Sequence, residues 1–268
     1  MDREAERERL RLTFDAVAAG YQEARPDYPP ELWAELLSLT GLRPAADPVC
    51  EVGSASGKAT LPLARLGFSI TCVELGTALA AQARRNLAGF ERVTVVNAPF
   101  ESWQPDRAGF ALLLAATAWH WLDPAVKYQK AAALLRPGGY LAFWEAVHVL
   151  PDGGDPFFLD IQDVYDAIGS GLPDGHVFAR PDTLASAEAE VAASGLFSEI
   201  SVRRFDWEVS YTAESYIRLL ETFSSNLTME PWQREQLYGE IRSRLAARPD
   251  GLLRRHWGAV LHVARTAG

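Results

Sequence analysis

From residue 48 onward, short apolar segments alternate along the chain with segments of helical periodicity. Strands are predicted at Val49–Val52, Ile70–Leu75, Val93–Asn97, Phe110–Ala116, Tyr140–Val147, Glu199–Tyr211 and His256–Ala264. Helices are predicted at Lys58–Leu66, Thr77–Leu87, Pro124–Leu135, Thr183–Ser194, Ala213–Ser224 and Pro231–Ala246. Because parallel strands must be joined by crossovers, this alternation predicts an α/β fold with a doubly wound, mostly parallel seven-stranded sheet.

Two segments, 1–47 and 151–182, lie outside this alternation. In the first, an apolar stripe that includes Tyr21 predicts a helix over residues 2–22, and a second helix is expected after Pro30. The second segment holds three turn clusters around a short helical patch, which is typical of an inserted lid. We expect a single domain over residues 1–268, divided into 1–47, 48–150, 151–182 and 183–268.

Charge and composition narrow the classes of partner. The 26 basic and 35 acidic side chains give a net charge of −9, which disfavours nucleic acid and anionic membrane surfaces as partners. Two cysteines cannot build a disulfide framework, and the N-terminus is too charged for a signal peptide. The histidines and acids show no metal-ligand spacing, so no metal site is expected. These features indicate a cytoplasmic location.

The segment Val49–Thr60 is the most informative, since a buried strand runs through a small-residue loop into a helix. A Walker phosphate loop would require glycine at Val52 and a hydroxyl residue at Ala59, so that pattern fails. A dinucleotide fingerprint would require a third glycine at Lys58, which is a poor fit. A ligand-free strand–turn–helix joint is the remaining plain alternative.

A third spacing, G-x-G-x-G with an acid two residues ahead, finds Glu51, Gly53, Ala55 and Gly57. In this pattern the chain resembles the class I S-adenosylmethionine-dependent methyltransferases. The resemblance implies that Glu51 lies near the cofactor's methionine amino group, and that Gly53, Ser54, Ala55 and Gly57 let the cofactor lie against the backbone. Ala55 departs from the family glycine, and its Cβ disfavours a positive φ.

The resemblance also implies cofactor contacts after the next two strands. Glu74 lies 21 residues beyond Gly53, a spacing that favours a ribose-binding acid over the alternative of a solvated acid that caps the helix beginning near Thr77. The other implied cofactor residues are Leu75, Ala98, Pro99, Phe100 and Ala116. Phe100 either stacks on the adenine or packs in the core, and Pro99 stands where many members carry Asp.

The turn after the fourth predicted strand carries the candidate catalytic residue. His120 lies in an A-x-H-W-x-D-P turn similar to those of small-molecule methyltransferases, where it is placed to accept a proton from the acceptor. The alternative is a structural histidine held between neighbouring tryptophans. Acceptor-binding residues are expected in this turn, the following strand and the N-terminal lid: Tyr21, Arg25, Tyr28, Trp119, Trp121, Trp144 and Glu145.

The resemblance therefore implies direct in-line transfer of a methyl group from S-adenosylmethionine to a small-molecule acceptor. Residues 1–47 and 151–182 are expected to act as lids over residues 48–150, which bind the cofactor, and the helices after residue 212 as a cap. One alternative is a methyltransferase fold with a repurposed, non-catalytic role. Another is an NAD(P)-dependent oxidoreductase, against which Lys58 counts. The sequence leaves the acceptor and the oligomeric state open.

Overall fold

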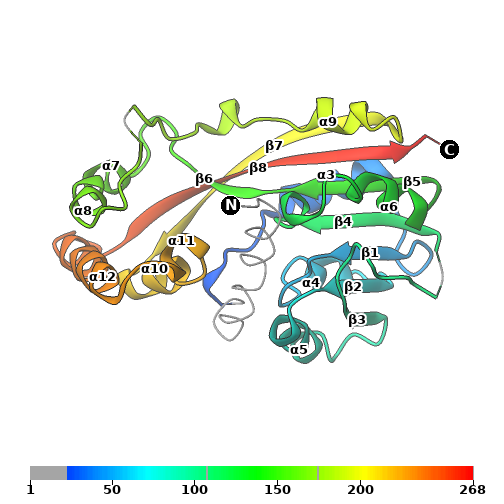
Figure 1. Cartoon of the computed structure of the whole chain (residues 1–268), viewed down its shortest axis with the longest axis horizontal. Helices are drawn as coiled ribbons and strands as arrows, with labels where there is room; N and C mark the ends of the chain where they lie inside the picture. The colour runs from blue at the N-terminus through cyan, green and yellow to red at the C-terminus, as the bar shows by residue number, and fades with distance from the viewer. Residues whose placement is uncertain (1–22, 107, 174, 268) are drawn as a thin grey trace.

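The computed structural model describes residues 23–106, 108–173 and 175–267. Within these residues, eight strands form one sheet in the order β3-β2-β1-β4-β5-β8-β6, with β7 paired to β8 (Figure 1). The strands are β1 Val49–Val52, β2 Ile70–Glu74, β3 Val93–Asn97, β4 Phe110–Ala116, β5 Leu135–Trp144, β6 Ala146–Val149, β7 Phe197–Tyr211 and β8 Leu253–Thr266. Strands β1 to β5 pair in parallel, whereas β8 is antiparallel to β5, β6 and β7.

Helices cover both faces of the parallel strands, as the alternation of strands and helices predicts. These helices are α3 Pro30–Thr40, α4 Thr60–Arg65, α5 Thr77–Asn86, α6 Lys127–Leu134 and α9 Glu188–Ala193. Leu36 of α3 and Leu63 of α4 belong to one hydrophobic cluster, and Ala131 of α6 and Val191 of α9 belong to another. The doubly wound α/β fold is thereby confirmed. The predicted helix over residues 2–22 lies outside the described residues.

The number of strands is one more than the seven that the sequence predicts. The single predicted strand Tyr140–Val147 divides at Glu145 into β5 and β6, which pair with consecutive stretches of β8. At this break the Thr117 N–H donates to the carbonyl oxygen of Trp144 at 2.7 Å. The Ala146 N–H donates to Thr117 Oγ1 at 3.2 Å. These two bonds to a residue after β4 interrupt the strand, and sequence periodicity gives no sign of them.

A helical cap surrounds the ends of β7 and β8 that extend away from the parallel strands (Figure 1). It consists of α7 Phe157–Asp160, α8 Gln162–Ala167, α10 Ala213–Leu220, α11 Ser224–Leu227 and α12 Pro231–Ala246. Phe157, Tyr216, Ile241 and Trp257 belong to a third hydrophobic cluster, so the inserted segment and the C-terminal helices share one core. Among the described helices, none has the length and hydropathy required to span a bilayer. The division of the chain into four segments stays a prediction.

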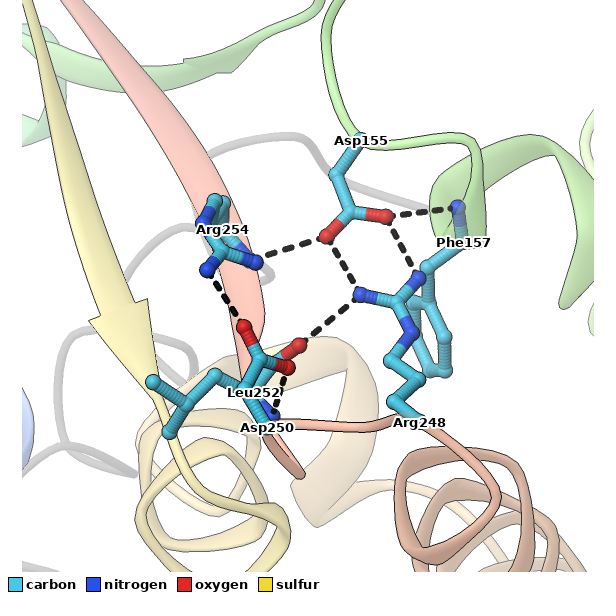
Figure 2. A network of polar contacts seen from close by, with 6 residues as sticks. All are labelled: Asp155, Phe157, Arg248, Asp250, Leu252 and Arg254. Carbon is cyan, nitrogen blue, oxygen red and sulfur yellow. Dashed lines mark hydrogen bonds and ion pairs between the residues drawn. The ribbon is translucent and has the colours of Figure 1, made fainter.

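A polar network attaches the inserted segment to the turn between α12 and β8 (Figure 2). The buried Asp155 carboxylate accepts hydrogen bonds from Arg248 Nη1 and Nη2 at 2.7 and 2.6 Å. It also accepts the backbone N–H groups of Arg254 at 2.9 Å and Phe157 at 3.0 Å. Burial by itself would raise the pKa of Asp155, but these bonds lower it to about 2. The insert is therefore held to the cap by a fully ionised buried acid.

Candidate active site

The loop between β1 and α4 adopts the left-handed backbone conformation that the glycine pattern predicts. Gly53 has a φ of +67°, and a Cβ there would lie 2.5 Å from the Cβ of Ala118. Ala55 occupies the same region with a φ of +46° although it carries a side chain. The Ala55 N–H donates to Glu74 Oε2 at 2.8 Å, which joins the loop to the end of β2.

Glu51 is a buried acid at the carboxyl end of β1, with 1% of its surface exposed. Its Oε2 accepts a hydrogen bond from Thr60 Oγ1 at 2.7 Å. Burial raises the pKa of Glu51 to about 8; the Thr60 bond opposes this shift and the charge of Glu74 adds to it. A carboxyl group in this state is suited to a cationic partner, which would restore its charge.

Glu74 is a buried acid at the end of β2 that binds backbone N–H groups on either side of it, whereas α5 has no side-chain cap hydrogen bond. Its Oε1 accepts the N–H of Gly76, the residue that precedes α5, at 2.8 Å. Its Oε2 accepts the N–H of Ala55 in the glycine loop. These bonds fix the carboxylate between the glycine loop and the start of α5. Glu74 also lines the main cavity.

A cavity of about 360 Å³ lies at the carboxyl edge of the parallel strands. Predicted site residues on its wall are Arg25, Gly53, Ala55, Glu74, Leu75, Ala98, Phe100, His120, Trp121 and Glu145. Phe100 packs in the core, 2% exposed within a hydrophobic cluster, and it also lines this cavity, while stacking on the adenine stays a prediction.

The remaining predicted site residues lie elsewhere. Glu51, Ser54, Ala116 and Tyr28 line a smaller cavity of about 60 Å³, which shares Gly53, Ala55 and Arg25 with the main one. Trp119 and Trp144 line a separate cavity of about 330 Å³, which also includes His120 and Glu145. Gly57 faces Leu87, and Pro99 is exposed and borders none of these cavities. Tyr21 lies outside the described residues.

His120 lies on a short 3₁₀ turn, Trp119–Trp121, that follows β4. Its Nδ1 lies 3.6 Å from Glu145 Oε2, and its ring lies 4.9 Å from that of Trp121. Burial lowers the pKa of His120; the Glu145 carboxylate opposes this change and the Lys127 ammonium reinforces it. The imidazole is therefore largely neutral near pH 7, the state in which it can accept a proton.

Comparison with known proteins agrees with this geometry. A family model described as a methyltransferase domain matches residues 49–139, from β1 into β5. An uncharacterised methyltransferase of Mycobacterium tuberculosis is 24% identical over 241 residues, covering 90% of this chain and 88% of that protein. A Saccharomyces cerevisiae protein described as a probable S-adenosylmethionine-dependent methyltransferase is 25% identical over 138 residues, 50% of this chain and 46% of its own.

The fold is shared with a methyltransferase structure from Anaeromyxobacter dehalogenans, with a TM-score of 0.61 at 24% identity, covering 90% of this chain and 97% of the other. The matched domain, these relatives and the shared fold together support a class I S-adenosylmethionine-dependent methyltransferase. The family that the glycine loop suggests is thereby confirmed.

In this methyltransferase, the sequence gives no signal for the role of Thr117. Its φ of +55° is an outlier for a β-branched residue. Its Oγ1 lies 2.9 Å from the hydroxyl of Tyr28 and accepts the N–H of Ala146. Strained residues of this kind cluster at functional sites, where the surrounding structure holds them in place. Thr117 lines both the main and the small cavity.

Four further residues of the methyltransferase line the main cavity from the cap side: His148, Phe223, Arg255 and Trp257. The sequence predicts a cap in the helices after residue 212 but singles out none of these four residues. Arg255 and Trp257 are two apart on β8, so their side chains share one face of the sheet. The alternation of side chains along a strand predicts that these two residues share a face, but it does not show which face of β8 lines the cavity.

Proposed function

We propose that this methyltransferase binds S-adenosylmethionine in the connected cavities and transfers its methyl group to a small-molecule acceptor. The observation that carries the proposal is Glu51, a buried carboxyl beside the glycine loop with its pKa raised to about 8. The methionine ammonium of the cofactor is a cation of the kind that such a carboxyl requires.

The residues around the two cavities fit the rest of the cofactor. Gly53 leaves the loop backbone accessible from both cavities, since no side chain covers it. Glu74 lines the main cavity as a carboxylate suited to ribose hydroxyls, and Leu75, Ala98 and Phe100 offer apolar contacts for a purine. Arg25 and Tyr28 border the small cavity together with Glu51, next to the proposed methionine end.

The chemistry places few demands on the protein. The bound sulfonium supplies an activated methyl group and leaves as a neutral thioether, so alignment and exclusion of water account for much of the rate. Trp121 and Trp257 line the main cavity and limit the access of water. Where the acceptor must lose a proton, the neutral His120 imidazole is positioned to accept it.

Two observations support a small acceptor in place of a macromolecule. The wall of the main cavity includes residues of both the sheet edge and the cap, so the transfer site is recessed. The net charge of −9 disfavours phosphate backbones and anionic membranes.

Both cysteines are free and buried, which supports the proposal of a reducing, cytoplasmic location.

Calorimetric titration with S-adenosylhomocysteine tests the proposal. The purified chain is expected to bind, and Glu51→Gln to weaken binding at least about tenfold, because a neutral amide cannot balance the ammonium charge. Glu91→Gln removes an exposed acid and serves as the control, with unchanged affinity expected.

The pH dependence of this affinity has a definite sign. Because Glu51 must lose its proton to pair with the ammonium, wild-type affinity is expected to rise between about pH 6 and pH 7.5, and that of Glu51→Gln to stay flat. No heat of binding with folded wild-type protein would refute the proposed cofactor. Equal affinity in wild type and Glu51→Gln would refute the role of Glu51.

A further inference from the structure

We propose that Arg255 binds the carboxylate of an anionic acceptor at the cap side of the main cavity. This inference rests on the proposed function, since it assigns a class of acceptor to the same site. It concerns a residue that the cofactor proposal does not use. Arg255 lines the 360 Å³ cavity but not the small cavity that contains Glu51.

The first observation is a buried cation without an anionic partner. Arg255 is 7% exposed, and its Nη1 donates to the neutral hydroxyl of Tyr216 at 3.3 Å. Its Nε is buried and has no hydrogen-bond acceptor among the described residues. No carboxylate of the described chain forms an ion pair with it. A buried charge in this state is costly unless a counter-charge arrives.

Three neighbouring arginines in the cap differ from Arg255, because each of them has a carboxylate partner. Arg248 binds the Asp155 carboxylate, Arg254 pairs with Asp250, and Arg244 pairs with Asp163 at 2.8 Å. All three have more exposed side chains than Arg255 and depend less on pairing. These three more accessible arginines thus have carboxylate partners, whereas Arg255, which lines the cavity, has none among the described residues.

Aromatic rings surround the guanidinium. Its central carbon lies 4.5 Å from the ring centre of Trp257 and 5.6 Å from that of Phe223. Such contacts hold the planar group in place, and its N–H edge is suited to a carboxylate, which it binds with two parallel hydrogen bonds. The same rings line the cavity and suit an acceptor with an apolar body.

The histidine adjacent to Arg255 is neutral. His148 lines the same cavity, and its Nε2 is buried with no hydrogen-bond partner among the described residues. Burial lowers the pKa of His148 to about 2, and the charge of Arg255 adds to this effect, so the ring stays neutral. His148 therefore adds no positive charge beside Arg255, whose planar N–H edge matches the two oxygens of a carboxylate.

Ligand titration of protein saturated with S-adenosylhomocysteine tests this inference. The probes are phenylacetate, cinnamate and hexanoate, each paired with its primary amide, together with phenyl phosphate. At millimolar concentration at least one acid is expected to bind, and its amide to bind at least about tenfold more weakly. If none of the acids binds, if amides bind as well as acids, or if phenyl phosphate binds better than the acids, the inference is wrong.

Three variants separate binding from structural roles. Arg255→Met is expected to weaken acid binding at least about tenfold while S-adenosylhomocysteine affinity stays within about twofold. Arg255→Lys keeps the positive charge but loses the planar guanidinium that forms two parallel hydrogen bonds to a carboxylate, so intermediate acid binding is expected. Arg254→Met, which removes a surface guanidinium from the same strand, is expected to bind acids like the wild type.

Thermal stability supplies an independent readout. Because Arg255→Met removes an unpaired buried charge, its melting temperature is expected to equal or exceed that of the wild type without ligand. A lower melting temperature with unchanged acid binding would show that Arg255 only supports the aromatic cluster. Loss of S-adenosylhomocysteine affinity in Arg255→Met would place Arg255 at the cofactor. Failure of the wild type to bind S-adenosylhomocysteine would instead refute the proposed function.

Discussion

Backbone strain at single residues is concentrated beside the main cavity. Four described residues other than glycine have a positive φ: Ala45, Ala55, Thr117 and Glu199. Ala55 and Thr117 line the cavity, at the ends of adjacent strands β1 and β4. Each is held by hydrogen bonds to a different segment, Ala55 to Glu74 and Thr117 to the β5–β6 break. Tertiary contacts therefore hold both residues in conformations that their side chains disfavour.

Replacing Ala55 with glycine tests whether its side chain limits cofactor binding. Ala55→Gly is expected to raise the free energy of unfolding by up to about 1 kcal/mol and to leave S-adenosylhomocysteine affinity unchanged or tighter. Ala45→Gly is the matched control, since Ala45 has a φ of +64° but is exposed and remote from the cavities. Calorimetry and chemical denaturation measure both effects. A large loss of affinity in Ala55→Gly would contradict the assigned role of the loop.

The environment of His120 predicts how its imidazole titrates. By NMR, with His120→Gln used to assign the signal, the wild-type pKa is expected below 6.5. Glu145→Gln removes the carboxylate that favours the charged ring, so it is expected to lower the pKa further. Lys127→Met is expected to raise it. A wild-type pKa above 6.5 would contradict the assignment of His120 as a neutral proton acceptor.

At the scale of elements, the long antiparallel pair of β7 and β8 connects the sheet to the cap. The C-terminal end of β8 pairs with β5. Residues at the opposite end of the β7–β8 pair, among them Tyr211 and Leu253, belong to the third hydrophobic cluster. The inserted helices α7 and α8 pack on the same cluster. The Asp155 network then links the start of α7 to the turn that begins β8 (Figure 2). The position of the insert therefore depends on a specific buried ion pair as well as on apolar packing.

Neutralising Asp155 is expected to destabilise this connection. Asp155→Asn leaves Arg248 without its buried partner and should lower the free energy of unfolding at pH 7 by about 2–4 kcal/mol. Asp152→Asn removes an exposed ion pair with Arg180 and should change it much less. Denaturant titration measures both variants. Similar losses in the two would contradict the importance of burial at Asp155.

The pH dependence follows from the lowered pKa of Asp155. The acid has an ordinary pKa of 3.8 when unfolded and about 2 when folded, so its contribution is complete above about pH 4. It is lost as the pH falls through 2, and amounts to roughly 2 kcal/mol. Asp155→Asn should therefore show a smaller loss of stability over this interval than the wild type.

At the scale of the whole molecule, the main cavity lies where the sheet edge meets the cap. Gly53 and Glu74 reach it from the parallel strands, while Phe223 and Trp257 reach it from the cap side. A ligand that fills the cavity must therefore contact structures built on different hydrophobic clusters. Binding is expected to couple them, because the ligand stabilises the arrangement in which both sets of contacts are made.

Hydrogen exchange measures this coupling. Saturating S-adenosylhomocysteine is expected to slow exchange by about tenfold or more in residues 52–57 of the glycine loop and in residues 219–227 of the cap. Helix α12 does not line the main cavity and should change little. Protection confined to the glycine loop and the end of β2 would contradict coupling between sheet and cap.

Local sequence patterns are sufficient to predict the strands of the parallel half of the sheet. The bounds of β1, β3 and β4 agree with prediction; β4 is a continuous apolar run, and β1 is apolar and buried apart from the equally buried Glu51. Helix α12 also agrees, since Pro231 marks its first residue and favours a helix start. The acid and glycines of the loop identify the family because each meets a need of the local backbone or of a cofactor.

The sequence by itself thus determined the order of elements, the glycine loop and the family. Only the tertiary structure decided how Arg255 and Trp257 face the site. That depends on β8 pairing with β6, where Trp257 lies opposite His148 more than a hundred residues away. It depends equally on the break at Glu145, which Thr117 imposes from another strand. Contacts between distant segments leave no periodicity in the chain, so these features follow only from the folded arrangement.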